Sequence, residues 1–223
     1  MKTRLTPPLT AEEAAGLNIC FLQDTSAAIA DATKDGSAVG IGVYTPVGEE
    51  AAYAGILPKD FLLIAQKGDA FGERLIFATE DLLHVGFQAL CLIDSDSPTV
   101  PAHAYSEAVG FLSQPGDRVV LGPSDDGGYY LIGMKRLHRE LFEGIDWSTE
   151  RVAEQTMQRA AELAIDVKML PTWYDVDDRI TLRRLCDELL GPAASEGYAA
   201  PRTRAYLTAI IEKEGRHRIW PNE

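Results

Sequence analysis

The sequence is poor in the residues that mark several common classes of protein. It has only three cysteines and four histidines among its 223 residues, and their separations fit neither a disulfide framework nor a metal-ligand spacing. No apolar run is long enough to span a bilayer. The first ten residues, MKTRLTPPLT, lack the apolar core of a secretory signal. These absences predict a cytoplasmic protein whose Cys20, Cys91 and Cys186 are buried free thiols.

Basic residues are also scarce. The chain has 21 lysines and arginines against 34 aspartates and glutamates, a formal net charge of −13. A surface of this charge repels the phosphates of DNA and RNA, so we expect no nucleic-acid partner. It also repels small anionic substrates, unless a metal ion or a local group of basic residues offsets the charge.

What the chain does contain is a regular alternation of strand and helix patterns. Short apolar runs predict strands at 38–44, 61–66, 88–94, 118–122, 128–134 and 166–170. Helical spacing predicts helices at 11–34, 72–86, 102–112, 148–163, 177–191 and 203–215. Thr10 and Glu13 match a capping box for the first helix, and Ser148 is the predicted cap of the fourth. This alternation is typical of an α/β domain with a mostly parallel sheet.

We expect one main domain over residues 1–190, followed by a helical extension over 191–223. In open α/β sheets, ligands bind beyond the carboxyl ends of the strands. The residues that directly follow each strand are therefore the places to look for a site.

Two aspartates, Asp94 and Asp96, follow the predicted buried strand at 88–94. If the backbone stays extended, residues two apart point the same way, so both carboxylates would face one spot. A hard divalent cation would relieve their repulsion, because it takes oxygen ligands. Asp and Ser before Pro98 are equally typical of a simple turn.

Two further acidic stretches also lie at strand ends. Asp175, Asp177 and Asp178 follow the strand at 166–170, where one of them could instead cap the next helix. Asp125 and Asp126 precede two glycines between the strands at 118–122 and 128–134, a pattern also typical of a hairpin turn. Three acidic clusters at strand ends favour a shared site more than any one of them does.

Four segments together resemble the bacterial DUF2064 family, often labelled as glycosyltransferases related to arsenosugar biosynthesis. They are IDSDSPTVP, VVLGPSDDGGYYLIGM, FEGIDWSTERVAEQT and WYDVDD. The resemblance runs from Lys2 to about Leu185, and the family is similar in fold to the nucleotidyltransferases that guanylylate molybdopterin or phospholactate. It implies a three-layer α/β/α fold of the GT-A type, a divalent metal such as Mg²⁺ or Mn²⁺, and a nucleotide or nucleotide-sugar donor with a small-molecule acceptor.

The resemblance also implies roles for particular residues. Asp96 matches the family's metal-binding aspartate, with Asp94 in a slot that the family does not always fill with an acid. Asp177 matches a late aspartate that can complete the metal site in related transferases.

The glycine-rich stretch matches the loop on the acceptor or sugar side, with Asp126 as a catalytic candidate and Gly127, Gly128 and Tyr129 beside it. Trp147 matches a loop near the active site, although a packed indole beside a helix cap explains it as well.

Basic residues match two further family segments. Lys2, Thr3 and Arg4 match the end of the family's N-terminal nucleotide loop, where cations could hold phosphates. Lys67 and Arg74 match a segment of the form QxGxxxGxR, for which a surface turn followed by a helix is the simpler explanation.

One departure concerns the sheet. The family has a strand and a glycine-containing loop ahead of the KTRL segment, whereas this sequence starts directly before it. A central strand left out would leave ladder groups unpaired. We therefore expect a rearrangement, a partner chain such as the second subunit of a homodimer, or a start codon assigned too late.

These observations predict a metal-dependent transferase that uses a nucleotide or nucleotide-sugar donor. Glycosyl transfer and nucleotidyl transfer stay open, as does a non-catalytic nucleotide-binding descendant. A phosphatase of the haloacid-dehalogenase type is the rival from another class, because its nucleophile also lies in a strand-end DxD. That motif usually follows the first strand of the fold, whereas here Ser97 and Pro98 follow it in mid-chain.

Overall fold

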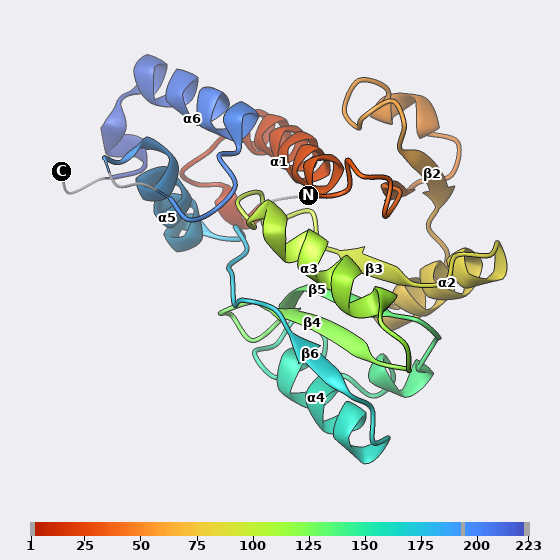
Figure 1. Cartoon of the computed structure of the whole chain (residues 1–223). Helices are drawn as coiled ribbons and strands as arrows, with labels where there is room; N and C mark the ends of the chain where they lie inside the picture. The colour runs from red at the N-terminus through yellow and green to blue at the C-terminus, as the bar shows by residue number, and fades with distance from the viewer. Residues whose placement is uncertain (1–2, 193–194, 221–223) are drawn as a thin grey trace.

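The computed structural model describes residues 3–192 and 195–220 (Figure 1). Its α-helices are α1 (Ala11–Ala32), α2 (Phe71–His84), α3 (Ala102–Ser113), α4 (Val152–Glu162), α5 (Arg179–Leu190) and α6 (Pro201–Glu214). Its strands are β1 (Ile41–Tyr44), β2 (Leu62–Ala65), β3 (Leu90–Ile93), β4 (Val119–Pro123), β5 (Tyr129–Met134) and β6 (Val167–Met169). Short 3-10 helices are η1 (Thr3–Leu5), η2 (Glu50–Tyr53), η3 (Arg139–Leu141) and η4 (Arg216–Arg218). The predicted α/β class is confirmed.

Four strands form the larger sheet, in the order β3-β5-β4-β6. β5 runs antiparallel to both of its neighbours, and β4 pairs in parallel with β6. It follows that β3, β4 and β6 all run in one direction, with β5 as the single reversed strand. The carboxyl ends of β3, β4 and β6 therefore lie at the same edge, which is where a ligand site is expected.

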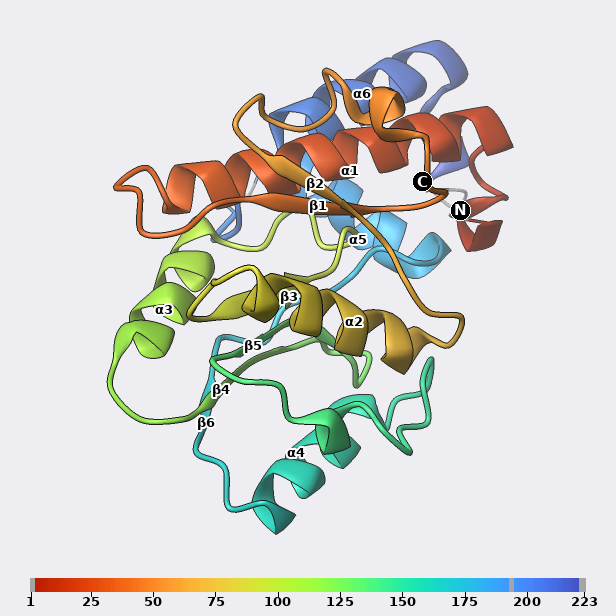
Figure 2. The ribbon, with the colours of Figure 1, turned by 90° about the vertical axis from the view of Figure 1, so that its right-hand side faces the viewer.

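β1 and β2 form a separate parallel pair. Figure 2 shows this pair beyond β3, on the side away from β5. The strand that the resemblance implies ahead of the KTRL segment is not among the described strands. These strands form two separate sheets, one of β1 and β2 and one that begins with β3.

The helices cover both faces of the larger sheet. Residues of α1 and α3 share a buried cluster with Val120, Tyr130 and Leu131 of one face. Residues of α2 and α4 share another cluster with Leu121 and Ile132 of the other face. This is the three-layer α/β/α arrangement that the resemblance implied.

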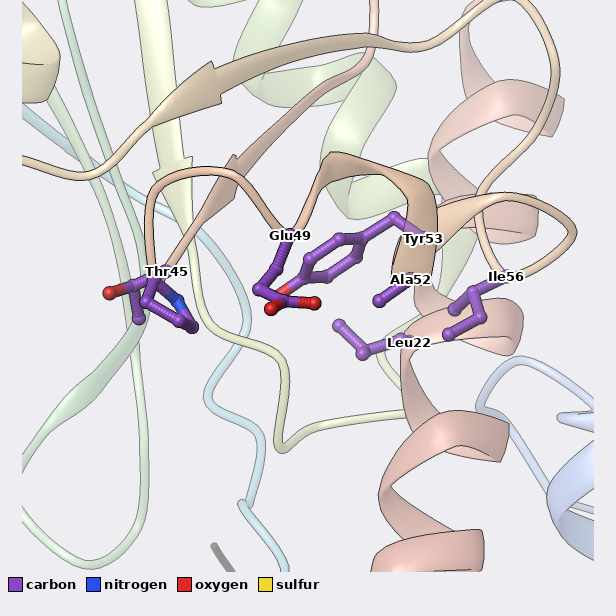
Figure 3. A pocket seen from close by; sticks show the side chains of 7 residues that line it. Leu22, Thr45, Glu49, Ala52, Tyr53 and Ile56 are labelled. Atoms are coloured by element: carbon purple, nitrogen blue, oxygen red, sulfur yellow. The ribbon is translucent and has the colours of Figure 1, made fainter.

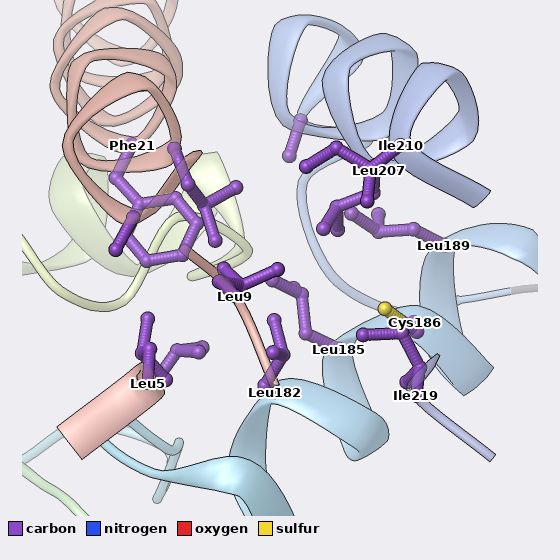
Figure 4. Packing of buried hydrophobic residues seen from close by; sticks show 14 of the residues in the cluster. Leu5, Leu9, Phe21, Leu182, Leu185, Cys186, Leu189, Leu207, Ile210 and Ile219 are labelled. Atoms are coloured by element: carbon purple, nitrogen blue, oxygen red, sulfur yellow. The ribbon is translucent and has the colours of Figure 1, made fainter. Parts of the chain in front are cut away.

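A third core joins α1 to the C-terminal helices (Figure 4). Phe21 of α1 and Leu207 of α6 are both fully buried in it. The buried carboxylate of Asp24 accepts hydrogen bonds from the amides of Arg202 (3.2 Å) and Thr203 (2.7 Å), which fixes the start of α6 against α1. The C-terminal helix therefore shares a core with the first helix of the chain.

The predicted cap of the first helix is confirmed. The Thr10 hydroxyl accepts from the Glu13 amide at 3.2 Å, and the Glu13 carboxylate accepts from the Thr10 amide at 2.8 Å. The predicted cap at Ser148 is wrong. Ser148 has φ +64°, and α4 begins at Val152 with Arg151 in the cap position.

The structure also bears on membrane association. Within residues 3–192 and 195–220, no helix is both long enough and apolar enough to cross a bilayer.

Candidate functional site

The loop after β3 carries Asp94 and Asp96 but does not continue the strand. β3 ends at Ile93, and the backbone bends at Ser95 and Asp96. The expectation that both carboxylates point the same way rested on an extended backbone, and that premise is wrong.

Asp94 helps to close this turn. Its carboxylate accepts from the hydroxyl of Ser97 at 2.7 Å, and its amide donates to the carbonyl of Tyr130 at 3.0 Å. Its charge also lies near Tyr105 and Tyr130, where it adds to burial in raising the pKa of both phenols. Asp94 therefore faces the inside of the fold, toward α3.

Backbone contacts bring the three acidic stretches to one edge of the sheet. The amide of Val176 donates to the carbonyl of Asp96 at 2.9 Å. The amide of Asp125 donates to the carbonyl of Trp173 at 2.9 Å, and the Ser124 hydroxyl donates to Asp175 at 3.4 Å. The segment after β6 thus touches both the β3 loop and the β4–β5 turn, as the sequence predicted.

Asp178, and not Asp177, occupies the cap position of α5. Asp178 caps α5, because its carboxylate accepts from the amides of Ile180 (2.8 Å) and Thr181 (2.9 Å). These bonds, the one to Thr181 above all, lower its pKa, and the positive charge of Arg4 adds to the effect. Asp178 is therefore the capping residue, and Arg4 lies close enough to act on the acidic edge.

The N-terminal basic segment lies beside α5. Leu5 of η1 is buried in the core that contains Leu182 and Leu185 of α5. Arg4 and Thr3 are exposed in this short helix, and the Thr3 carbonyl accepts from the Thr6 hydroxyl at 2.6 Å. Lys2 lies outside the described residues.

The turn between β4 and β5 is stabilised by a hydrogen bond within it and by packing against the start of α4. The exposed carboxylate of Asp126 accepts from the amide of Gly128 at 2.8 Å. Gly127 has φ +92°, and a Cβ at this position would lie 2.1 Å from the carbonyl oxygen of Glu150. The Gly127 carbonyl accepts from the amide of Ala153 at 2.8 Å. Gly127 thus allows the close packing of this turn against the start of α4.

Tyr129 lies at the start of β5 and packs with the core under α4. Burial raises the pKa of its phenol, whose hydroxyl lies near that of Thr156. The side chain therefore points into the protein rather than toward the exposed carboxylate of Asp126.

Lys67, Arg74 and Trp147 have local partners. Lys67 forms an ion pair with Asp81 at 2.7 Å. Arg74 donates to the carbonyls of Gly68 (3.4 Å) and Asp69 (3.0 Å), as expected for a turn that starts a helix.

Trp147 meets the ring of Phe71 edge to face, with centroids 4.9 Å apart. A Cβ on Gly72 would lie 2.5 Å from the Phe142 carbonyl and 3.1 Å from the Trp147 ring nitrogen. These contacts favour the packed-indole explanation for Trp147.

A hollow of about 410 Å³ lies at the carboxyl end of β1 (Figure 3). Its lining residues are Leu22, Thr45, Pro46, Glu49, Ala52, Tyr53 and Ile56. None of the aspartates discussed above lines it, and its walls are mainly apolar. With Glu49 as the one charged wall, it suits an uncharged or aromatic group better than a phosphate.

The acidic edge is not a ready-made cage for a metal. Among the described residues, no group of three or more His, Cys, Asp or Glu side chains could hold a metal ion together. Mg²⁺ commonly binds through one or two carboxylates and keeps waters and substrate phosphates as its other ligands. The carboxylates at this edge therefore fit a Mg²⁺ ion that one or two of them hold together with the substrate, and they do not fit a metal held by protein ligands alone.

Sequence reasoning missed a cation at this edge. Arg184 of α5 forms an ion pair with Asp125, and its guanidinium lies 3.8 Å from the centroid of the Tyr174 ring. The signal was available, because Arg184 lies on the helix that opens directly after the WYDVDD segment. A basic side chain in the first two turns of that helix is expected to lie near the site that the WYDVDD segment helps to form.

Sequence and structure comparisons place the chain among known proteins. A family model described as "Uncharacterized protein conserved in bacteria (DUF2064)" matches residues 28–149. The WYDVDD segment lies outside this match. Among curated proteins, none has a sequence that matches the chain.

A solved structure is similar over nearly the whole chain. It is described as a "putative nucleotide-diphospho-sugar transferase" from Desulfovibrio desulfuricans G20. The similarity has a TM-score of 0.80 and 26% sequence identity, and it covers 99% of this chain and 91% of that one.

Proposed function

The chain belongs to the DUF2064 family of bacterial proteins, and from this premise we propose that it is a transferase with a nucleotide or nucleotide-sugar donor. The similar structure is described as a "putative nucleotide-diphospho-sugar transferase". The observation that carries the proposal within this chain is the 2.9 Å bond from the Val176 amide to the Asp96 carbonyl. It joins two acidic segments, 80 residues apart in sequence at Asp96 and Val176, at the ligand-binding edge of the sheet.

A divalent metal is part of the proposal. Asp96 would hold it, with Asp177 or Asp94 as the second carboxylate. Asp94 is the less favourable partner, because its carboxylate faces the inside of the fold near Tyr105 and Tyr130. When bound, Mg²⁺ or Mn²⁺ would supply positive charge for the phosphates of the donor.

The protein side chains have separate roles in this proposal. Arg4 and Lys2 bind donor phosphates, which offsets the negative charge of the acidic edge. Asp126 is exposed on the β4–β5 turn and orients the acceptor hydroxyl or takes its proton. Glycosyl transfer and nucleotidyl transfer would use the same residues, so the reaction product distinguishes them.

The test is a thermal-shift screen of nucleotides and nucleotide sugars, with and without Mg²⁺ or Mn²⁺. A donor at 100 times its Kd stabilises the native state by about 2.7 kcal/mol, or roughly 5–10 °C for a chain of this size. We expect such a shift for one donor only when metal is present. Asp96→Asn should abolish the shift.

Asp166→Asn is the matched control. Asp166 is an exposed aspartate just before β6, at the opposite edge of the sheet, where it pairs with Lys168 at 3.2 Å. This variant should keep the full shift. A full shift in Asp96→Asn would remove Asp96 from the site, and a screen in which no donor stabilises the wild-type chain would overturn the transferase proposal. A donor that binds but yields no product would mark a non-catalytic descendant.

A further inference from the structure

The acidic edge of the sheet contains one cation that other side chains hold in place. The guanidinium of Arg184, on α5, donates to the carboxylate of Asp125 on the β4–β5 turn. Its flat face lies on the ring of Tyr174, 3.8 Å from the centroid. Three separate segments, α5, the β4–β5 turn and the stretch after β6, therefore meet at this one side chain.

The ring under Arg184 is fixed from below. Tyr174 is only 2% exposed, and its hydroxyl donates to the carboxylate of Glu188. The ring of Trp173 stacks beside it, with centroids 6.1 Å apart. A guanidinium that lies on so rigid a surface is oriented before any ligand arrives, which lowers the cost of ordering it on binding.

The turn on the other side of Arg184 is fixed by its backbone. The amide of Asp125 donates to the Trp173 carbonyl at 2.9 Å, and Ser124 forms a parallel bridge with the same residue. The Asp125 carboxylate does not take part in these contacts, so it is free to orient the guanidinium from one side.

The pair of Arg184 and Asp125 is open to solvent. The two side chains are 51% and 43% exposed, and an ion pair at such exposure adds little to stability. A guanidinium presents its N–H donors in a planar fork that matches a carboxylate. In the part of the chain that the structure describes, Asp125 is the only hydrogen-bond partner of the Arg184 side chain, at Nη1. Its Nε and Nη2 donors are therefore available to a ligand.

The charges around Arg184 restrict the kind of anion that it can hold. Asp125 and Asp126 lie on the same turn, and Asp175 lies within reach of the Ser124 hydroxyl. Each of these carboxylates repels an anion, and the repulsion doubles when the anion carries two charges. One guanidinium at this edge therefore suits a singly charged carboxylate better than a phosphate.

Asp126 indicates what else such a ligand carries. Its carboxylate is exposed on the turn, one residue beyond the partner of Arg184, and consecutive Cα atoms are about 3.8 Å apart. A molecule with its carboxylate on Arg184 therefore needs only a few more atoms to bring a hydroxyl group to Asp126.

We propose that Arg184 is a carboxylate-binding residue and that the acceptor of this protein is a small hydroxy acid. Arg184 binds the carboxylate of the acceptor through its open donors, and Asp126 receives the hydroxyl. The identification of this ligand as an acceptor rests on the proposed transferase function. The carboxylate site itself does not depend on it.

The test uses glycolate, the simplest hydroxy acid, with the full chain free of metal and donor. Nuclear magnetic resonance follows the backbone amides of residues 124–128 at constant ionic strength. We expect these signals to shift with glycolate until they saturate. Arg184→Gln should weaken the affinity by about tenfold or more, because a charge-assisted pair is lost. Arg184→Lys keeps the charge without the fork and should give a smaller loss.

Two further variants serve as controls. Arg183→Gln changes the neighbouring exposed arginine of α5, which pairs with Asp187 at 3.8 Å, and it should bind glycolate as the wild type does. Asp125→Asn removes a competing carboxylate and should bind glycolate more tightly. All four variants should melt close to the wild type, since the side chains changed are exposed.

Three results would overturn the carboxylate site: no saturable shift in the wild type, unchanged affinity in Arg184→Gln, or an equal loss in Arg183→Gln. Tighter binding of inorganic phosphate than of glycolate at the same amides would reject the choice of a carboxylate. The donor screen is a separate measurement. A positive screen without glycolate binding keeps the transferase and rejects the hydroxy acid, whereas glycolate binding with a negative screen keeps the carboxylate site and rejects its role for an acceptor.

Discussion

Single residues in this protein show how hydrogen bonds decide between similar side chains. The carboxylate of Asp94 accepts a hydrogen bond from the Ser97 hydroxyl within its own turn. The backbone carbonyl of Asp96, two residues later, accepts from the Val176 amide in the segment after β6. Asp177 and Asp178 differ in the same way, since Asp178 is committed to capping α5. The carboxylates of Asp94 and Asp178 thus each stabilise a local turn or helix start.

Gly127 gives a prediction at the residue scale. An alanine here must adopt φ near +92° and place its Cβ 2.1 Å from the Glu150 carbonyl oxygen. Gly127→Ala should lower the free energy of unfolding by at least about 2 kcal/mol, because strain and overpacking add. Urea unfolding measures this.

Gly48→Ala is its matched control. Gly48 has φ +94°, but nothing lies within 4 Å of the position of its Cβ. This variant should lose only about 1–2 kcal/mol from the left-handed backbone. Equal losses in the two variants would show that the contact with Glu150 has no energetic effect.

At the scale of elements, a buried polar network ties three segments of the site together. Glu188 of α5 accepts from the hydroxyl of Tyr174, after β6, and lies 3.4 Å from the hydroxyl of Thr99, after β3. The indole of Trp173 donates to Thr99 at 3.1 Å, and the amide of Tyr198 donates to the Thr99 carbonyl at 2.8 Å. Glu188 therefore positions the loop that carries Asp96.

Replacing Glu188 should loosen these segments together. Glu188→Ala leaves the Tyr174 hydroxyl without its acceptor, which costs about 1–3 kcal/mol of stability. Amide exchange should also quicken in the loop 95–99. Glu196→Ala removes an exposed carboxylate from the same region and should change neither quantity. A stable Glu188→Ala variant with unchanged exchange in the loop would contradict this role.

At the scale of the whole molecule, the sequence predicted the positions of the strands better than the exact helix starts and the contacts between elements. All six predicted strands are present with ends within a few residues, because their apolar runs and glycine or proline boundaries are local signals. The start of α4 was misplaced, because Thr149 uses its hydroxyl to bond the Asp146 carbonyl (2.7 Å) and leaves Ser148 outside the helix.

The site was predictable only in part. The meeting of the three acidic stretches follows from where parallel strands end, so sequence order was enough. The direction of the Tyr129 side chain depends on packing against residues distant in sequence, which no local pattern identifies. The division of the strands into two sheets likewise depends on long-range pairing.

An ion pair between Glu13 of α1 and Arg218 of η4 adds to the contacts that join the two ends of the described chain. Arg218 donates to both carboxylate oxygens of Glu13 (2.9 and 2.6 Å), and this lowers the pKa of Glu13 from 4.5 to about 2. Because the folded pKa is depressed, the contribution to stability is complete above about pH 4.5 and is lost as the pH falls toward 2. Glu13→Gln should lower the free energy of unfolding by about 1–2 kcal/mol at pH 7, and the difference from wild type should shrink with acidification. Urea unfolding at several pH values measures it, and Glu12→Gln, in the same helical turn, should show no such trend. A deficit in Glu13→Gln that stays constant as the pH falls would mean that the charge of Glu13 is not what joins the two ends.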